Sequence, residues 1–375
     1  MKGKVLIIGG AGFIGSHTAE ELARRGYEIR IFDNLSPKTH FGNWPEYLNS
    51  DFEKIEGDVR NPDQLLPAMT GVDFVINLAA LMDLMPNFSD FFDTNVTPTA
   101  RIFEYIVAKN LPIRKVIVAS SQFAYGEGRW QCGKDGDVYP SVRTPQQLMA
   151  KQWDPVCPQC GGVITPLPSL ESHQDPPNQY AISKYTQELI AVKIGRQYNI
   201  PAVAMRYSIV HGPRQSLKNA YSGALRIFAL KMLKNENPPI YEDGQMRRDF
   251  VSVYDVARAN ADVLESNAAN FENFNVGAGR FYTVMELATM IAKKLGKNFE
   301  LKATGQFRVG DIRHAVSSVK KLESIGWKPV DKEDKILDIY LSWLREEISK
   351  RDYYSYLSEA EVKMARAGII KQSEG

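Results

Sequence analysis

Cysteine is scarce in this chain, which has three among its 375 residues. Three cysteines cannot form the disulfide framework that staples small secreted domains. All three lie in two short stretches, "GRWQCGKDG" at 128–136 and "CPQCGG" at 157–162. The second stretch has the C-x2-C spacing, which in a reducing compartment indicates metal or redox chemistry.

The chain also lacks a long apolar run and an excess of charge of one sign. No stretch of about 18 apolar residues occurs, so we expect no transmembrane helix. Lysine and arginine number 46 against 44 acidic residues, which gives no support for a nucleic-acid or membrane-surface partner. The N-terminal "MKGKVLIIGGAGFIG" begins as a signal peptide would, but its glycines suit a turn better. We therefore expect a cytoplasmic protein.

Short apolar strands alternate with amphipathic helices over the first 211 residues. This alternation predicts an α/β fold built on a doubly wound parallel sheet, of the Rossmann type. After residue 212 the pattern is less regular, which indicates a second, smaller mixed α/β lobe. The expected strands lie at 4–8, 27–33, 52–58, 72–80, 114–121 and 201–208, and the expected helices at 16–26, 61–70, 95–110 and 180–199.

Gly9, Gly12 and Gly15 form a G-x-x-G-x-x-G pattern between the first strand and the first helix. Such glycines permit a tight turn and let the backbone approach a pyrophosphate at the helix N-terminus. Asp33 ends the second strand, where its carboxylate would accept from ribose hydroxyls and repel a 2′-phosphate. The pattern predicts an NAD site, with a glycine-rich turn beside a solvated Asp as the alternative. Asp58, in "GDV", is placed to hold the adenine amino group unless it is only a turn residue.

Tyr180 and Lys184 form Y-x-x-x-K on an expected helix. A pair at i and i+4 shares one helix face, so the ammonium would favour the phenolate and lower the tyrosine pKa. Ser121 closes a strand at its carboxyl end, where α/β sheets carry their sites. The three residues are therefore the candidate catalytic set.

Several of these motifs together resemble one family. The motifs "GGAGFIG", "LAA", "SSQFAYG", "YAISK", "RYSIVHGPRQ" and "DGQMRRDFVSVYDVA" follow the order and spacing of the extended short-chain dehydrogenase/reductases, over about residues 3 to 345. The resemblance implies NAD-dependent chemistry on a nucleotide-linked sugar, with Ser121, Tyr180 and Lys184 as catalytic residues. It implies cofactor contacts from Gly9, Gly12, Phe13, Ile14, Gly15, Asp33, Asn34, Asp58, Val59, Leu78, Ala79, Ala80, Asn95, Tyr180 and Lys184. It implies substrate contacts from Gln122, Asn219, Arg248, Arg308 and Asp311.

The resemblance also divides the chain. It implies an NAD-binding domain at 1–211 plus 249–276, with an insertion at about 128–175. A substrate-binding lobe would comprise 212–248 plus 277–350, followed by a polar C-terminal tail at 351–375 that we expect to be a loosely attached helix. The apolar positions of the helices at 180–199 and about 97–109 exceed what one buried face needs, which favours a homodimer as in the family. The alternative is that both faces are buried within one subunit.

The positions after Ser121 help to select the reaction. Sugar 4,6-dehydratases of this family place an Asp-Glu pair there, and the decarboxylases keep a Glu. Gln122 and Phe123 cannot transfer protons, so oxidation and reduction at one carbon remain, which is enough for a nucleotide-sugar 4-epimerase with tightly bound NAD. A 4-ketoreductase or dehydrogenase with exchangeable NAD(P) and a non-enzymatic NAD-binding sensor are the alternatives.

Two departures from the family pattern affect the expected substrate. Ile209 replaces an asparagine that commonly touches substrate, and Asn77 stands where "HLAA" has histidine. The first argues against ordinary UDP-glucose specificity. The run at 206–224 together with the cysteine insertion is most similar to the dTDP-L-rhamnose 4-epimerase type, so a dTDP- or UDP-linked deoxyhexose or hexose is expected.

The cysteines fall in the insertion, because the chain from Gly126 to Gln179 is longer than in the family. Cys132, Asp135, Cys157 and Cys160 read C-x2-D…C-x2-C, which is close to a zinc ribbon with one cysteine replaced. An insertion poor in apolar residues would struggle to fold without a metal. We expect a structural, non-catalytic zinc whose fourth ligand is Asp135, His173 or water. Free or redox-active thiols and an accidental spacing are the alternatives.

Overall fold

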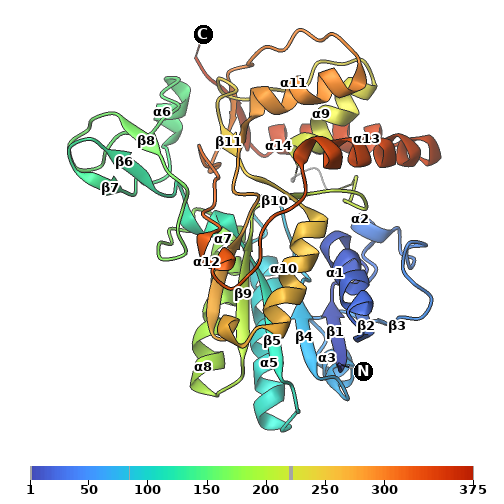
Figure 1. Cartoon of the computed structure of the whole chain (residues 1–375). Helices are drawn as coiled ribbons and strands as arrows, with labels where there is room; N and C mark the ends of the chain where they lie inside the picture. The colour runs from blue at the N-terminus through green and yellow to red at the C-terminus, as the bar shows by residue number, and fades with distance from the viewer. Residues whose placement is uncertain (1, 84, 219–222, 375) are drawn as a thin grey trace.

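The structure is a computed structural model, and it describes residues 2–83, 85–218 and 223–374. Its larger lobe is built on a seven-stranded parallel sheet with the strand order β13-β9-β5-β4-β1-β2-β3 (Figure 1). The strands are β1 (Lys4–Ile8), β2 (Glu28–Asp33), β3 (Glu53–Glu56), β4 (Phe74–Asn77), β5 (Lys115–Ser121), β9 (Ala202–Tyr207) and β13 (Glu272–Val276). The predicted doubly wound sheet is confirmed.

Both faces of the central part of this sheet are buried, which explains why β1 and β4 and most of β5 are continuous apolar runs. Alternate residues of each strand enter two different clusters. Helices α1 and α10 cover one face, and α3, α5 and α7 cover the other. The bounds are α1 (Phe13–Arg24), α3 (Pro62–Met69), α5 (Thr97–Ala108), α7 (Gln179–Leu189) and α10 (Val253–Glu265).

The strand order places the site. Successive strands run outward from β1 to β3 on one side and from β4 to β13 on the other. The order therefore reverses between β1 and β4, and ligands of such sheets bind at the carboxyl ends of the strands beside this reversal. Short segments complete the lobe: α2 (Pro37–His40), α4 (Phe88–Phe91), η1 (Phe92–Val96), η2 (Gln122–Tyr125), η3 (Ile190–Ile194), α8 (Gly195–Gln197), η4 (Asn267–Ala269) and α12 (Lys320–Glu323).

A smaller lobe packs helices around a second core above the carboxyl ends of the sheet (Figure 1). Its helices are α9 (Ala224–Leu233), α11 (Val284–Leu295), α13 (Glu333–Lys350) and α14 (Tyr354–Arg366). Three two-stranded pairs join them: β10 (Ile209–His211) with β12 (Phe250–Ser252), β11 (Arg247–Arg248) with β14 (Tyr282–Thr283), and β15 (Gln306–Arg308) with β16 (Ile370–Gln372). Within the described ranges, no helix is long and apolar enough to cross a membrane.

The C-terminal segment is attached more firmly than its polar composition suggests. Tyr353 and Leu357 are buried in the core of the smaller lobe, and Met364 is buried as well. Strand β16 then pairs antiparallel with β15, with Ile370 opposite Arg308. The expectation of a loosely attached tail is wrong, because a few apolar residues and one strand are enough to dock it.

The insertion forms a small unit beside the smaller lobe (Figure 1). Three short antiparallel strands have the order β7-β6-β8, and one short helix lies between β7 and β8 in the sequence. They are β6 (Trp130–Cys132), β7 (Gly136–Val138), β8 (Ile164–Pro166) and α6 (Pro145–Met149). Its buried apolar cluster comprises only Trp130, Cys132, Val138, Cys157 and Ile164. A core of this size gives little hydrophobic stabilisation by itself.

Candidate active site

A cavity of about 420 Å³ lies at the carboxyl ends of the sheet strands and extends into the smaller lobe. Residues from both lobes line it. Among the candidate residues, Gly9, Gly12, Phe13, Ile14, Gly15, Leu78, Ala80, Ser121, Gln122, Tyr180, Lys184, Arg248, Arg308 and Asp311 are on its walls. The fold thus brings the glycine turn, the catalytic set and most of the substrate candidates to one continuous space, whereas Asp33, Asn34, Asp58, Val59, Ala79 and Asn95 do not line it.

The glycine turn after β1 is shaped for close approach of backbone to a ligand. Gly9 has φ +75°, and a Cβ there would lie 2.7 Å from the backbone nitrogen of Ala79. A Cβ on Gly15 would overlap the carbonyl oxygen of Gly9 and lie 2.7 Å from Cα of Gly10. Helix α1 starts immediately after this turn and has no acidic residue in its first turn. Its free N–H groups and dipole therefore favour an anion such as a pyrophosphate.

Asp33 lies at the end of β2, and its carboxylate accepts from the backbone N–H groups of Ala11 and Leu35, both at 3.0 Å. His40 is a further neighbour, with its Nε2 3.8 Å from the carboxylate. Burial raises the pKa of the Asp33 carboxyl, and the neighbouring His40 and the N–H donors oppose this shift. A carboxylate has about four acceptor positions, so Asp33 keeps capacity for ribose hydroxyls.

Asp58 and Asn34 form a polar cluster that the sequence did not reveal. The Asp58 carboxylate accepts from the backbone, Nε and Nη2 of Arg60 and from Asn34 Nδ2. The hydrogen bond from Arg60 lowers the Asp58 pKa to about 2. These four donors fill its acceptor positions, so an adenine amino group would have to displace one of them. Val59 beside it is buried.

Asn95 supports the cavity wall rather than lining it. Its side chain accepts from the backbone N–H of Leu81 and donates to the Leu81 carbonyl and to Ser183 Oγ. It thereby holds the loop after β4, which includes Leu78 and Ala80 of the cavity wall. Asn95 itself is fully buried in the π-helical turn η1 before α5.

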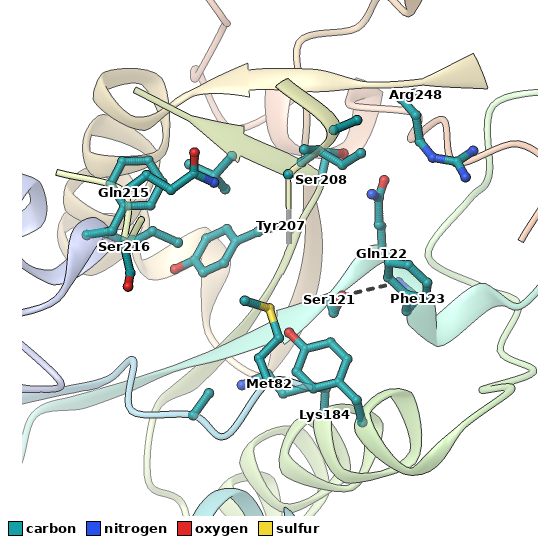
Figure 2. A pocket seen from close by; sticks show the side chains of 18 of the residues that line it. Met82, Ser121, Gln122, Phe123, Lys184, Tyr207, Ser208, Gln215, Ser216 and Arg248 are labelled. Carbon is teal, nitrogen blue, oxygen red and sulfur yellow. Dashed lines mark hydrogen bonds between the residues drawn. The ribbon is translucent and has the colours of Figure 1, made fainter. Parts of the chain in front are cut away.

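Helix α7 carries Tyr180 and Lys184 to the end of β5, where Ser121 is the last residue. The helix begins at the cap Asn178, whose side chain accepts from the Ala181 N–H. It is fastened to the sheet by the buried pair of Glu188 with Arg206, whose two N–O distances are 2.8 and 2.6 Å. Figure 2 shows Lys184 and Ser121 on the same side of the cavity, across from Arg248.

Burial dominates the electrostatics of this set. It raises the pKa of Tyr180 to about 12, while a hydrogen bond with Ser121 acts in the opposite direction. Burial also lowers the pKa of Lys184 to about 7. The expectation that Lys184 lowers the tyrosine pKa is therefore not met by the chain itself, because the ammonium donates to Gln187 Oε1 at 2.7 Å.

Gln187 belongs to a buried chain of hydrogen bonds that sequence reasoning missed. Its amide nitrogen donates to Thr99 Oγ1 at 2.8 Å, and Asn77 Nδ2 donates to the same oxygen at 3.0 Å. Thr99 in turn donates to the Asn95 carbonyl. Asn77, one of the two departures from the family pattern, thus belongs to the network that holds Lys184. The i, i+3 spacing of Lys184 and Gln187 was the available signal.

Polar side chains line the substrate end of the cavity, and some of their hydrogen-bonding atoms have no partner in the part of the chain that the structure describes. Gln122 points between Ser208 and Arg248 in Figure 2, and its buried Oε1 has no hydrogen-bond partner among the described residues. Arg248 lies 3.5 Å from Asp311. Arg308 stacks over the Tyr241 ring, with 5.2 Å to its centroid. Asn219, the remaining candidate, lies outside the described residues.

The smaller lobe also contributes residues that carried no sequence signal. Tyr241 and Gln215 line the cavity, and so do Glu361 and Met364 of the C-terminal helix α14. Gln215 Oε1 accepts from the Tyr340 hydroxyl at 3.3 Å. The polar composition of α14 hid this role, because it gave no reason to expect the helix beside the cavity.

The four candidate metal ligands converge in the insertion. One ligand atom from each of Cys132, Asp135, Cys157 and Cys160 lies within 4.8 Å of the others. Asp135 Oδ2 is 3.3 Å from the sulfur of Cys132 and 3.1 Å from that of Cys157. His173, the other candidate, stacks on the Tyr139 ring instead. Of the two side-chain candidates for a fourth ligand, Asp135 is therefore the one that lies beside the three sulfurs.

Comparisons with known proteins agree with this geometry. The dTDP-L-rhamnose 4-epimerase of Burkholderia thailandensis is 31% identical over 93% of this chain and 97% of its own length. A putative UDP-glucose 4-epimerase of Methanocaldococcus jannaschii is 32% identical over 91% and 98%. The crystal structure of a Thermotoga maritima UDP-glucose 4-epimerase with UDP-glucose superposes with a TM-score of 0.75 at 27% identity, covering 92% of this chain and 99% of that one.

A family model matches most of the chain in two blocks, residues 5–144 and 161–277. Residues 145–160, which include Cys157 and Cys160 of the insertion, lie between the two blocks and are not matched by the family model. The blocks contain the glycine turn, Ser121, Tyr180, Lys184 and Arg248. By this match, the chain belongs to the NAD dependent epimerase/dehydratase family.

Proposed function

We propose that the protein is a nucleotide-sugar 4-epimerase that oxidises and reduces C4 of a dTDP- or UDP-linked hexose or deoxyhexose with tightly bound NAD. The observation that carries the proposal is the wall of the cavity around Ser121. Tyr180 and Lys184 supply an acid and base there, whereas the next residues, Gln122 and Phe123, have no titratable group. Chemistry that needs a second acid or base on the sugar has no residue for it at these positions.

The glycine turn fits NAD, because side chains at Gly9 and Gly15 would collide with backbone and leave no room for a pyrophosphate against α1. When bound, NAD supplies the hydride acceptor and donor, and its cationic nicotinamide ring favours the ionised phenol. Asp33 would hold the ribose hydroxyls. Gly9, Gly12, Gly15 and the α1 N-terminus would hold the pyrophosphate.

The chain's own residues then do acid–base work. Tyr180 takes the proton of the C4 hydroxyl and later returns it, while Ser121 holds the same sugar oxygen. Lys184, whose pKa burial lowers to about 7, lies one helical turn from Tyr180 on the same face of α7. Arg308 binds the diphosphate with its guanidinium fork. Arg248, whose Nη atoms already donate to backbone carbonyls, adds its positive charge, which fixes one end of the substrate while the sugar turns over.

The epimerase reading predicts that the purified protein carries NAD and converts its substrate without added cofactor. The reason is that a 4-epimerase returns the hydride within each turnover. The test is incubation with a panel of dTDP- and UDP-sugars without NAD, followed by NMR. With NAD added in excess, sustained formation of one NADH per product would instead identify the dehydrogenase, and consumption of one NAD(P)H per 4-keto sugar would identify the ketoreductase. Binding of NAD with no conversion of any sugar would favour the non-enzymatic sensor.

The same proposal includes a structural zinc ion in the insertion, held by Cys132, Asp135, Cys157 and Cys160. Tetrahedral zinc with Zn–S bonds of about 2.3 Å separates its sulfur ligands by about 3.8 Å. The sulfurs of Cys132 and Cys160 are 3.6 Å apart, close to that value. Because the apolar cluster of the insertion is small, binding of the metal would supply folding free energy that the cluster does not. The ion is not catalytic, because its ligands do not line the cavity.

A homodimer is the proposed assembly. Phe88, Phe92, Val107, Ile182 and Leu189 are all exposed large apolar side chains. They lie on α4, η1, α5 and α7, and α4 and η1 contact α7. Exposed apolar side chains gathered on neighbouring elements favour an interface.

We expect sedimentation at micromolar concentration to give the mass of a dimer. Replacing Ile182 with aspartate should place a charge in the interface and release monomers. Val330→Asp is the matched control, because Val330 is also an exposed aliphatic residue, at 64% against 41% for Ile182, but belongs to none of these elements. A monomeric wild-type protein would contradict the proposal.

A further inference from the structure

A buried network of ion pairs joins the insertion to the smaller lobe. Its members are Glu127, which immediately precedes the insertion, Arg143 within the insertion, and Glu242 and Arg313 from the smaller lobe. The side chains of all four are at most 2% exposed. Arg143 Nε donates to Glu127 at 3.0 Å, and its Nη1 donates to Glu242 at 2.9 Å. Arg313 Nη1 donates to the same Glu242 oxygen at 2.8 Å.

Side chains of this network form hydrogen bonds with the backbone of residues 311–313. Arg143 Nη2 donates to the Asp311 carbonyl at 3.2 Å. The backbone N–H of Arg313 donates to Glu127 Oε2 at 2.8 Å. The segment is therefore held at one end by Arg143 of the insertion and at the other by Glu127 at the start of the insertion's N-terminal connection.

Residues 311–313 also contact Arg248, which lines the cavity. Arg248 Nη1 donates to the Arg313 carbonyl at 2.9 Å, and its Nη2 donates to the Ile312 carbonyl at 3.1 Å. Asp311 Oδ2 is a third neighbour, at 3.5 Å from Nη2. The Arg247 carbonyl also accepts from Nη1, at 3.0 Å. A guanidinium held by three carbonyls has one orientation, and two of the three belong to residues 311–313.

We infer that Arg143 and Glu127 are positioning residues for the diphosphate end of the substrate site, acting through residues 311–313 on Arg248. The insertion thereby belongs to the substrate site without touching substrate. The inference rests on the proposed function for the identity of the ligand, a nucleoside diphosphate with its sugar. It does not depend on the metal, since neither residue is a candidate ligand.

The geometry requires an arginine at position 143. Its planar fork makes four separate contacts, to Glu127, Glu242, the Trp153 carbonyl and the Asp311 carbonyl. Lysine keeps the charge that balances the two carboxylates but presents a single nitrogen on a flexible stem. Arg143→Lys thus separates the loss of the fork from the loss of charge.

The experiment measures the binding of dTDP and of UDP to the NAD-loaded protein by calorimetry, for wild type, Arg143→Lys and Glu127→Gln. Arg129→Lys is the matched control, because Arg129 is in the same insertion and pairs with Asp137 at the surface. We expect the dissociation constant to rise about tenfold in Arg143→Lys, a size typical of indirect contacts. With the nucleotide sugar, KM should rise by more than kcat falls, and Arg129→Lys should match wild type.

Unchanged nucleotide affinity in a folded Arg143→Lys protein that retains NAD would overturn the inference and leave the proposed function intact. If Arg143→Lys does not fold, Glu127→Gln decides in the same way, since it preserves shape and removes one charge. A wild-type protein that binds neither dTDP nor UDP would overturn the substrate class and this inference with it.

Discussion

Replacing Tyr180 with phenylalanine is expected to reduce turnover by about 10²–10⁴-fold, the usual contribution of a general acid–base group. The variant loses only the phenolic oxygen, so the buried ring still fills its place beside Ser121. NAD should remain bound, because the glycine turn and Asp33 are untouched. Turnover is measured by NMR on the nucleotide sugar identified in the panel, and bound NAD by its absorbance after release.

Tyr185→Phe is the matched control for this experiment. Tyr185 lies on the same helix α7, and its hydroxyl bonds Gln174 at 3.4 Å, away from the catalytic set. We expect this control to keep wild-type turnover. Near-normal turnover of Tyr180→Phe would show that the catalytic base lies elsewhere.

Loss of the zinc site is expected to unfold the insertion while the large sheet stays folded. Structural zinc contributes about 10–16 kcal/mol in zinc-finger peptides, far more than the small apolar cluster of the insertion supplies. Cys157→Ser should therefore lose the metal, and the amides of β6, β7 and β8 should exchange rapidly with deuterium. The strands β1 and β5 should remain protected, because their packing does not involve the insertion.

Asp137→Asn is the control, since Asp137 lies two residues from Asp135 but pairs with Arg129 at the surface. It should keep both zinc and protection. Elemental analysis of wild-type protein purified without a metal-binding tag gives the direct measurement. Less than about a tenth of an equivalent of zinc, with all three thiols titratable in the native protein, would exclude a structural metal. A disulfide between Cys132 and Cys160 would instead support redox chemistry.

The sequence allowed the large sheet and the cavity's catalytic wall to be predicted because both depend on local signals. A continuous apolar run such as 115–121 forms a strand buried on two faces, and the Y-x-x-x-K spacing fixes two residues on one helix face. The strand order then brings their ends together. The C-terminal helix was misjudged because its docking depends on a few separated apolar residues, among them Leu357 and Met364.

The sequence predicted the positions of the site residues better than their pKa shifts and hydrogen-bond partners. The spacing of Tyr180 and Lys184 was read as a direct interaction, but the ammonium turns to Gln187, and burial controls both pKa values. The same holds for Asp58. Its partner Arg60 is only two residues away, but the pair matches no known motif, so the sequence did not predict the interaction. Desolvation and competing partners depend on the packed structure, so a sequence pattern cannot supply them.

The placement of β15, α14 and β16 late in the chain separates two stages of biosynthesis. All seven strands of the large sheet and the helix with Tyr180 precede residue 277, whereas Arg308 and Glu361 of the cavity follow it. At ribosomal rates of about 5–20 residues per second, the nascent chain spends roughly 5–20 seconds between the last sheet strand and β16. During that interval the glycine turn is available to NAD, but the diphosphate end is incomplete. The order of the chain thus completes the cofactor end of the cavity before the diphosphate end.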